Sequence, residues 1–216
     1  MDHFELQPLF DQAELGRSLA KLHSHPAGDR FGFEVDNTIG GTPQQNGWLS
    51  DWVEFFVKRR LQPQLKRTQD AEAQRLGELV IARIPSLFAG LHVKPSLLHG
   101  DLWSGNIGGH WPHAASNTAA SGNGAPVARA SVGSPVLIDP ACYYGHSEAE
   151  FGMAWCATFS PAFWEAYHAI IPRQPGEEER RRLYTLYHVI NHWNLFGGGY
   201  REKAFGLLHS LAKSPA

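Results

Sequence analysis

The feature that most constrains the fold of this chain of 216 residues is a short stretch near its middle, residues 96–106. It opens with the run Ser96-Leu97-Leu98, which is typical of a short buried strand, and it breaks at Gly100. Asp101 and Asn106 follow the break with four residues between them. Because a loop at the end of a strand can aim both side chains at one bound group, we expect the rest of the chain to act as its scaffold.

The run from His99 to Asn106 follows the pattern H-R-D-L-x-x-x-N of the protein-kinase catalytic loop at every fixed position except the arginine, where Gly100 stands. In that loop the Asp accepts the proton of an attacking hydroxyl, and the Asn holds a magnesium ion. The spacing therefore predicts Asp101 as the catalytic residue and Asn106 as a metal ligand. His99 is predicted to brace the loop in a supporting role.

A second short apolar run, residues 135–138, ends in Asp139. A carboxylate at the end of a buried strand is costly unless a cation satisfies it, so Asp139 is predicted as the second metal ligand. Between the two strands, residues 108–134 are dominated by Gly, Ala, Ser, Asn and His without periodicity. We expect a flexible insertion there, at the tip of a hairpin formed by the two strands.

The remaining segments are mainly helical in pattern, which predicts a mostly α member of the α+β class over residues 1–216. Helices are expected over residues 9–23, from about Gly47, over 69–89, 161–168 and 202–212, with a long helix that stops at residues 197–199. Ser147 and Glu150 have the spacing of a capping box. His23 is expected at the surface, and the charged run 177–182 is expected to be a solvated first turn.

The composition excludes several classes of partner. The formal net charge is −2, and 19% of the residues are charged, so neither nucleic acid nor an anionic membrane is indicated as a partner. The two cysteines are too few for a disulfide framework, and no apolar run approaches the roughly 18 residues that a membrane span needs. A cytoplasmic location is the default expectation.

Four segments resemble the fructosamine kinases, the family of protein-ribulosamine and fructosamine 3-kinases. They are Leu98-His99-Gly100-Asp101-Leu102-Trp103-Ser104-Gly105-Asn106, Asp139-Pro140-Ala141-Cys142-Tyr143-Tyr144-Gly145-His146-Ser147-Glu148, Phe31-Gly32-Phe33 with Asp36-Asn37 and Thr42-Pro43-Gln44, and Asn191-His192-Trp193-Asn194-Leu195-Phe196-Gly197. The second of these looks most similar to plant and algal members. The likeness runs from about residue 1 to residue 212, apart from the insertion.

The resemblance implies the C-terminal, helical lobe of a kinase-like fold, related to the aminoglycoside phosphotransferases, with a small β-hairpin that carries the active site. It implies ATP-dependent phosphorylation of the sugar 3-hydroxyl of a protein-bound ketosamine, with Mg²⁺, so glycated proteins or glycated lysine would be the substrates. Trp103 would bind the sugar. Residues 1–8 look like the hinge between the lobes, where Asp2, His3 and Phe4 would meet the adenine.

The family's N-terminal β-lobe precedes that hinge, and no segment here resembles its phosphate-covering loop or its lysine. We therefore expect a chain that contains the C-terminal lobe only and that binds ATP weakly and turns over poorly by itself. We expect a plastid location if a transit peptide lies upstream. The oligomeric state is left open. Two alternatives remain: a phosphotransferase of the aminoglycoside or choline kinase type, and a non-catalytic binding module derived from a kinase.

Overall fold

The computed structural model of the chain describes residues 11–110 and 134–213. The predicted hinge residues Asp2, His3 and Phe4 and most of the predicted insertion lie outside these ranges. The described part is mainly helical, with three two-stranded antiparallel sheets. The prediction of a mostly α chain of the α+β class is therefore confirmed.

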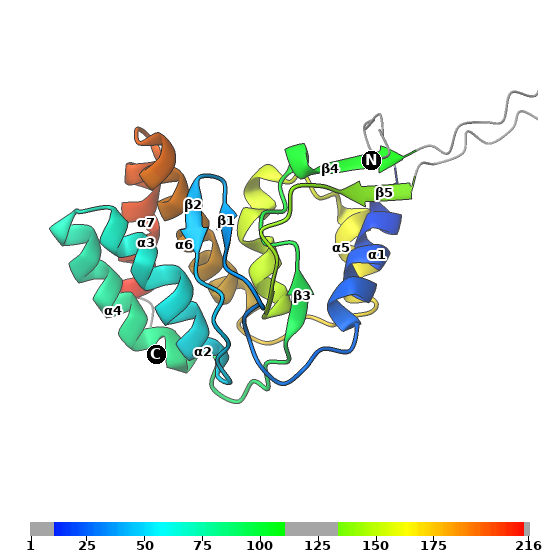
Figure 1. The fold of residues 1–216 in the computed structure, drawn as a ribbon, viewed down its shortest axis with the longest axis horizontal. Coiled ribbons are helices and arrows are strands. Elements are labelled where there is room, and N and C mark those ends of the chain that lie inside the picture. The colour runs from blue at the N-terminus through cyan, green and yellow to red at the C-terminus, as the bar shows by residue number, and fades with distance from the viewer. Residues whose placement is uncertain (1–10, 111–133, 214–216) are drawn as a thin grey trace, which may run out of the picture.

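Helices gather in two groups on either side of strand β3 (Ser96–Leu98), as Figure 1 shows. One group contains α2 (Trp52–Phe56), α3 (Gln62–Arg67), α4 (Ala71–Leu87), α6 (Glu177–Phe196) and α7 (Tyr200–Lys213). The other contains α1 (Gln12–Ser24) and α5 (Pro161–His168), which pack against each other. Each group has its own cluster of buried apolar side chains. The strand that leads into the predicted loop thus lies between two separately packed cores.

Local sequence signals explain where several helices begin and end. Asp11 caps α1 by accepting a hydrogen bond from the backbone N–H of Glu14 at 2.9 Å, and Asp70 caps α4 in the same way. The helix expected from Gly47 begins later, at Trp52, because Asp51 provides its cap. It continues through a π-helical turn, Val57–Leu61, into α3. Gly197, with φ of 64°, ends α6, as the glycine run predicted.

The sequence predicted that the strand before the loop pairs with the apolar run before Asp139, and this prediction is wrong. β3 pairs with β6 (Tyr143–Gly145), which follows Asp139 in the chain, and not with the apolar run before Asp139. That run forms β5 (Ser134–Leu137) and pairs with β4 (Ile107–His110), which begins directly after the predicted loop. Since the ends of the expected insertion belong to β4 and β5, its predicted boundaries were too wide.

Two further predictions are corrected by the segment after β6. Residues 147–156 form a long 3₁₀ helix (η3, Ser147–Cys156) whose first turn has no side-chain cap, so Ser147 and Glu150 do not form a capping box. The charged run 177–182 is not wholly solvated either. Arg180 is buried and forms a bidentate ion pair with Glu148, with both N–O distances at 2.7 Å. Tertiary contacts therefore override both local patterns.

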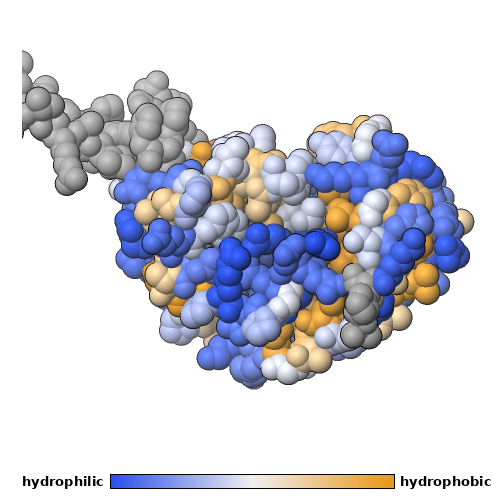
Figure 2. All heavy atoms as spheres, turned by 180° about the vertical axis from the view of Figure 1, so that it is seen from behind, coloured by the Kyte–Doolittle hydropathy of each residue, from blue (hydrophilic) through white to orange (hydrophobic). Residues whose placement is uncertain are grey.

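A second short hairpin, β1 (Asn37–Ile39) with β2 (Thr42–Gln44), interrupts the polar segment before α2. Its side chains reach the stretch that follows Asp139: Asn37 Nδ2 donates to the carbonyl of Cys142 at 2.8 Å. The face of the molecule in Figure 2 is covered largely by hydrophilic side chains, with small hydrophobic areas between them. None of the helices described is long and apolar enough to cross a membrane.

Candidate active site

The predicted loop follows β3 directly, and its conformation depends on Gly100. This residue has φ of 82°, a left-handed value that side chains other than hydrogen rarely adopt. A Cβ atom there would lie 2.3 Å from the backbone oxygen of Ala141. Gly100, which stands where the kinase pattern has arginine, thus allows the segment after Asp139 to pack closely against the loop. We call residues 99–106 the candidate loop.

Asp101 and Asn106 are held together through the backbone of the candidate loop. Asn106 Nδ2 donates a hydrogen bond to the backbone carbonyl of Asp101 at 2.9 Å, and the same carbonyl accepts from the backbone N–H of Trp103 at 3.2 Å. Asn106 is buried, whereas Asp101 is half-buried and its carboxylate accepts no hydrogen bond from any described residue. The carboxylate of Asp101 therefore remains available to an incoming hydroxyl.

Burial raises the pKa of Asp101, and the negative charges of Asp139 and Glu150 act in the same direction, while His99 opposes them. A proton acceptor works best when its pKa lies near the working pH, so this shift suits general-base chemistry. It also indicates that Asp139 lies within electrostatic range of Asp101. The two acidic residues that the sequence singled out are thus brought to one place.

His99 connects the candidate loop to the segment that carries Asp139. Its Nε2 lies 2.7 Å from the backbone oxygen of Ile138, and its Nδ1 accepts from the backbone N–H of Asp101 at 3.3 Å. The two contacts fix the orientation of the His99 ring between the candidate loop and the backbone of Ile138. The Asn106 carbonyl also accepts from the N–H of Ile138 at 3.1 Å, so two hydrogen bonds align the loop with the residue before Asp139.

The free oxygens of Asn106 and Asp139 match the ligand preferences of magnesium. Asn106 uses its Nδ2 for the loop, which leaves Oδ1 without a hydrogen-bond donor among the described residues. Asp139 is exposed, and in the part of the chain described its carboxylate has no ion pair or hydrogen bond. Mg²⁺ takes one or two protein oxygens and completes its shell with phosphate and water, so the two side chains fit this ion.

Trp103 presents an apolar face beside the loop. The indole is 42% exposed, and it covers Gly105, where a Cβ atom would lie 2.3 Å from the ring. A side chain at position 105 would therefore displace the ring. An exposed indole next to Asp101 can contact the apolar face of a sugar ring without contributing charge.

The sequence missed two residues of this site. Glu150 accepts hydrogen bonds from the backbone N–H groups of His99 at 2.7 Å and of Gly100 at 2.9 Å. His23, expected at the surface, is buried, with Nε2 3.2 Å from Glu150. These contacts join residues 50 to 127 positions apart, so no local pattern could reveal them.

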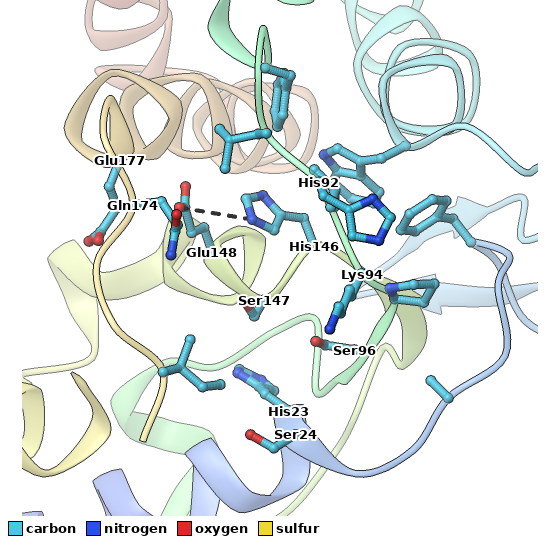
Figure 3. Close-up of a pocket in the computed structure, with 18 of the residues that line it drawn as sticks. His23, Ser24, His92, Lys94, Ser96, His146, Ser147, Glu148, Gln174 and Glu177 are labelled. Carbon is cyan, nitrogen blue, oxygen red and sulfur yellow. Dashed lines mark ion pairs between the residues drawn. The ribbon is translucent and has the colours of Figure 1, made fainter. Parts of the chain in front are cut away.

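A large cavity lies elsewhere, at the other end of β3. Its volume is about 1320 Å³, and its polar lining includes Ser96, His146 and Glu148, which Figure 3 shows around the opening. No residue of the candidate loop lines it. The candidate site is instead the open surface around Asp101, while the buried His23 lies between this surface and the cavity.

Comparison with known proteins decides the family. The family model described as Fructosamine kinase matches residues 1–214. The chain belongs to the fructosamine kinase family. Its relatives include the chloroplastic protein-ribulosamine 3-kinases of Oryza sativa subsp. indica, 48% identical over 92% of this chain, and of Arabidopsis thaliana, 47% identical over 92%. The ketosamine-3-kinase of Mus musculus is 38% identical over 99% of this chain and 72% of its own length.

The fold agrees with this membership. A crystal structure of a Thermobifida fusca protein, described as a fructosamine-3-kinase, superposes with a TM-score of 0.81 at 28% identity, over 99% of this chain and 69% of that one. The match covers 54% of the rice relative and 56% of the Arabidopsis relative, so the chain spans about half the length of these plant proteins. The recognition made from the candidate loop is thereby confirmed at the level of the family.

Proposed function

We propose that this chain carries the acceptor-phosphorylating part of a ketosamine 3-kinase that acts on ribulosamine or fructosamine attached to protein lysines. The observation that carries the proposal is the arrangement around Asp101. Its carboxylate is half-buried and has no hydrogen-bond donor or ion-pair partner among residues 11–110 and 134–213, and Asn106 is tied to the same loop. The names of the rice, Arabidopsis and mouse relatives support the class of acceptor.

The proposed reaction is transfer of the terminal phosphoryl group of ATP to the sugar 3-hydroxyl. The hydroxyl oxygen forms a bond to the γ-phosphorus, the bond between that phosphorus and the β–γ bridging oxygen breaks, and ADP leaves. Asp101 takes the proton from the hydroxyl. Asn106 and Asp139 hold Mg²⁺, which neutralises charge on the phosphates when it is bound. Trp103 contacts the sugar, and His99 keeps the loop aligned with the Asp139 segment.

Asp2, His3 and Phe4 are proposed to contact the adenine of ATP; they lie outside the described residues. The compartment is proposed to be the plastid, because the rice and Arabidopsis relatives are named as chloroplastic. Glycated proteins of that compartment would then be the substrates.

The test is an assay of the purified chain with ATP, Mg²⁺ and a peptide that contains ribulosyl-lysine, with the phosphorylated peptide detected by mass spectrometry. Asp101→Asn removes the proton acceptor and is expected to lower the rate by about 10²-fold or more. Asp29→Asn, at an exposed position outside the candidate loop, is the matched control and should retain the rate.

Three outcomes would overturn the proposal. One is preferred phosphorylation of choline or an aminoglycoside over ribulosyl-lysine, which would favour the other phosphotransferase class. The second is an Asp101→Asn variant as fast as the unmodified chain, because the proton acceptor would then be a different group. The third is binding of ribulosyl-lysine without any phosphate transfer, which would favour a non-catalytic module.

A further inference from the structure

The carboxylate of Glu150 is the point at which three hydrogen-bond donors from distant parts of the chain converge. Its Oε2 accepts from the backbone N–H of His99 at 2.7 Å, and its Oε1 accepts from that of Gly100 at 2.9 Å. His23 Nε2 lies 3.2 Å from Oε2, and the side chains of His23 and Glu150 are both fully inaccessible to solvent. The carboxylate therefore holds the two residues immediately before Asp101 by their backbone.

His23 is itself fixed from its other side. Its Nδ1 lies 2.8 Å from the hydroxyl of Tyr167, a buried residue of α5, while His23 belongs to α1. The two aromatic rings also meet edge to face, with centroids 5.7 Å apart. The contact between α1 and α5 is thus extended by polar groups up to the candidate loop.

We propose that Glu150 is a positioning residue for Asp101, and that His23, oriented by Tyr167, keeps the Glu150 carboxylate in place. This proposal deepens the proposed phosphoryl transfer and rests on it for its catalytic consequence. Gly100 explains why such an anchor is needed. Its left-handed backbone gives the loop its bend, and without a side chain it can be held only through its backbone.

Burying the charged carboxylate of Glu150 is unfavourable in free energy, so the hydrogen bonds that it accepts must compensate for the loss of water. Removing an ionised carboxylate from water is unfavourable by several kcal/mol unless hydrogen bonds satisfy it. Burial by itself raises the pKa of Glu150, but the hydrogen bond and charge of His23 and the contacts with His99 outweigh it and lower this pKa. The ionised form accepts from all three donors at once, and charge-assisted hydrogen bonds are stronger than neutral ones.

One amide signal reports this contact directly. His99 and Gly100 form the only His–Gly pair in the sequence, so a chain labelled with ¹³C at the histidine carbonyl and ¹⁵N at glycine gives a single correlated amide signal, that of Gly100. In Glu150→Gln, the most favourable orientation of the side-chain amide lets its oxygen accept from His99 and His23. Its NH₂ group then faces the N–H of Gly100, which loses its hydrogen-bond acceptor. The Gly100 proton should then move upfield, and its exchange with solvent should accelerate.

The matched control is Glu148→Gln. Glu148 lies two positions earlier on η3, is also buried, and pairs with Arg180 rather than with the loop. Both variants remove one buried carboxylate, so both should lose stability, but only Glu150→Gln should move the Gly100 signal. His23→Ala and Tyr167→Phe should move it in the same direction by successively smaller amounts, and they carry the test if Glu150→Gln lacks the native fold.

The kinetic readout separates positioning from substrate binding. Misplacement of a reacting group by about 1 Å can cost about 10²-fold in rate, so Glu150→Gln is expected to lower kcat for ribulosyl-lysine by tenfold or more. The KM for ribulosyl-lysine should change by less than about threefold, because Trp103 and the exposed site surface remain.

An unmoved Gly100 signal in folded Glu150→Gln would overturn the proposal, and so would an equal movement in Glu148→Gln. A lower kcat in Glu148→Gln that matches Glu150→Gln would also overturn it. If the unmodified chain phosphorylates no ketosamine even at saturating ATP, the proposed function fails, while the Gly100 signal still decides whether Glu150 holds the loop.

Discussion

Two buried histidines are expected to make the fold sensitive to mild acid. Burial lowers the pKa of His146 and of His188 from 6.5 to about 3. His146 Nδ1 lies 2.8 Å from the hydroxyl of Tyr184, and His188 lies against the backbone of Gly152. Burial leaves each ring poorly solvated if it becomes charged, so each stays neutral in the folded protein above about pH 3.

The size of the effect follows from the two pKa values. Between pH 6.5 and pH 3 the unfolded chain binds a proton at each of these rings and the folded chain does not, so the free energy of unfolding decreases as the pH falls. A pH of about 5 lies about 1.5 units below the pKa of the histidine in the unfolded chain. Each of the two histidines therefore lowers the free energy of unfolding by about 2 kcal/mol at that pH. Above about pH 7.5 both contributions are fully retained.

His188→Gln removes one of the two titrations. Urea unfolding of this variant at about pH 7.5 and pH 5 is expected to show about 2 kcal/mol less acid-induced loss of stability than the unmodified chain. His25→Gln is the control, because His25 is exposed and its substitution should leave the loss unchanged. If His188→Gln loses as much stability as the unmodified chain over this range, the assignment of a neutral buried His188 is refuted.

Further predictions concern backbone strain and buried charge. Gly100→Ala is expected to lower the free energy of unfolding in urea by about 3 kcal/mol or more, because a steric clash adds to the strain of the left-handed backbone. Gly90→Ala is the control: φ is 75° there, also left-handed, but the space around the residue is open, so the loss should be only about 1–2 kcal/mol. Equal costs would contradict the close approach. Arg180→Met should lower the free energy of unfolding by about 3–5 kcal/mol because it leaves Glu148 uncompensated, while Arg182→Met, in an exposed pair, should cause little change in the same assay.

The prediction from sequence succeeded where neighbouring residues act together. The helices α1, α4 and α6 follow apolar spacing and end signals that lie within each segment. It failed where a local pattern competed with a distant contact. Ser147 and Glu150 have the spacing of a helix cap, yet Glu150 is drawn into the interior by the backbone of the candidate loop.

The sequence by itself determined which residues form the candidate loop and where the loop bends. His99, Gly100, Asp101 and Asn106 are close in the chain, and the bend at Gly100 is a property of that residue. Membership of the fructosamine kinase family could be recognised for the same reason. The proposed roles of Asp101, Asn106 and Asp139 remain predictions until the kinetic variants are measured.

Only the tertiary structure decided what holds that loop in position. β3 pairs with β6 rather than with β5, Glu150 reaches the loop from η3, and His23 of α1 reaches Glu150. A buried carboxylate is stable only where donors from several segments converge, and that convergence is created by packing the two helical groups on either side of β3. Spacing along one segment cannot encode it.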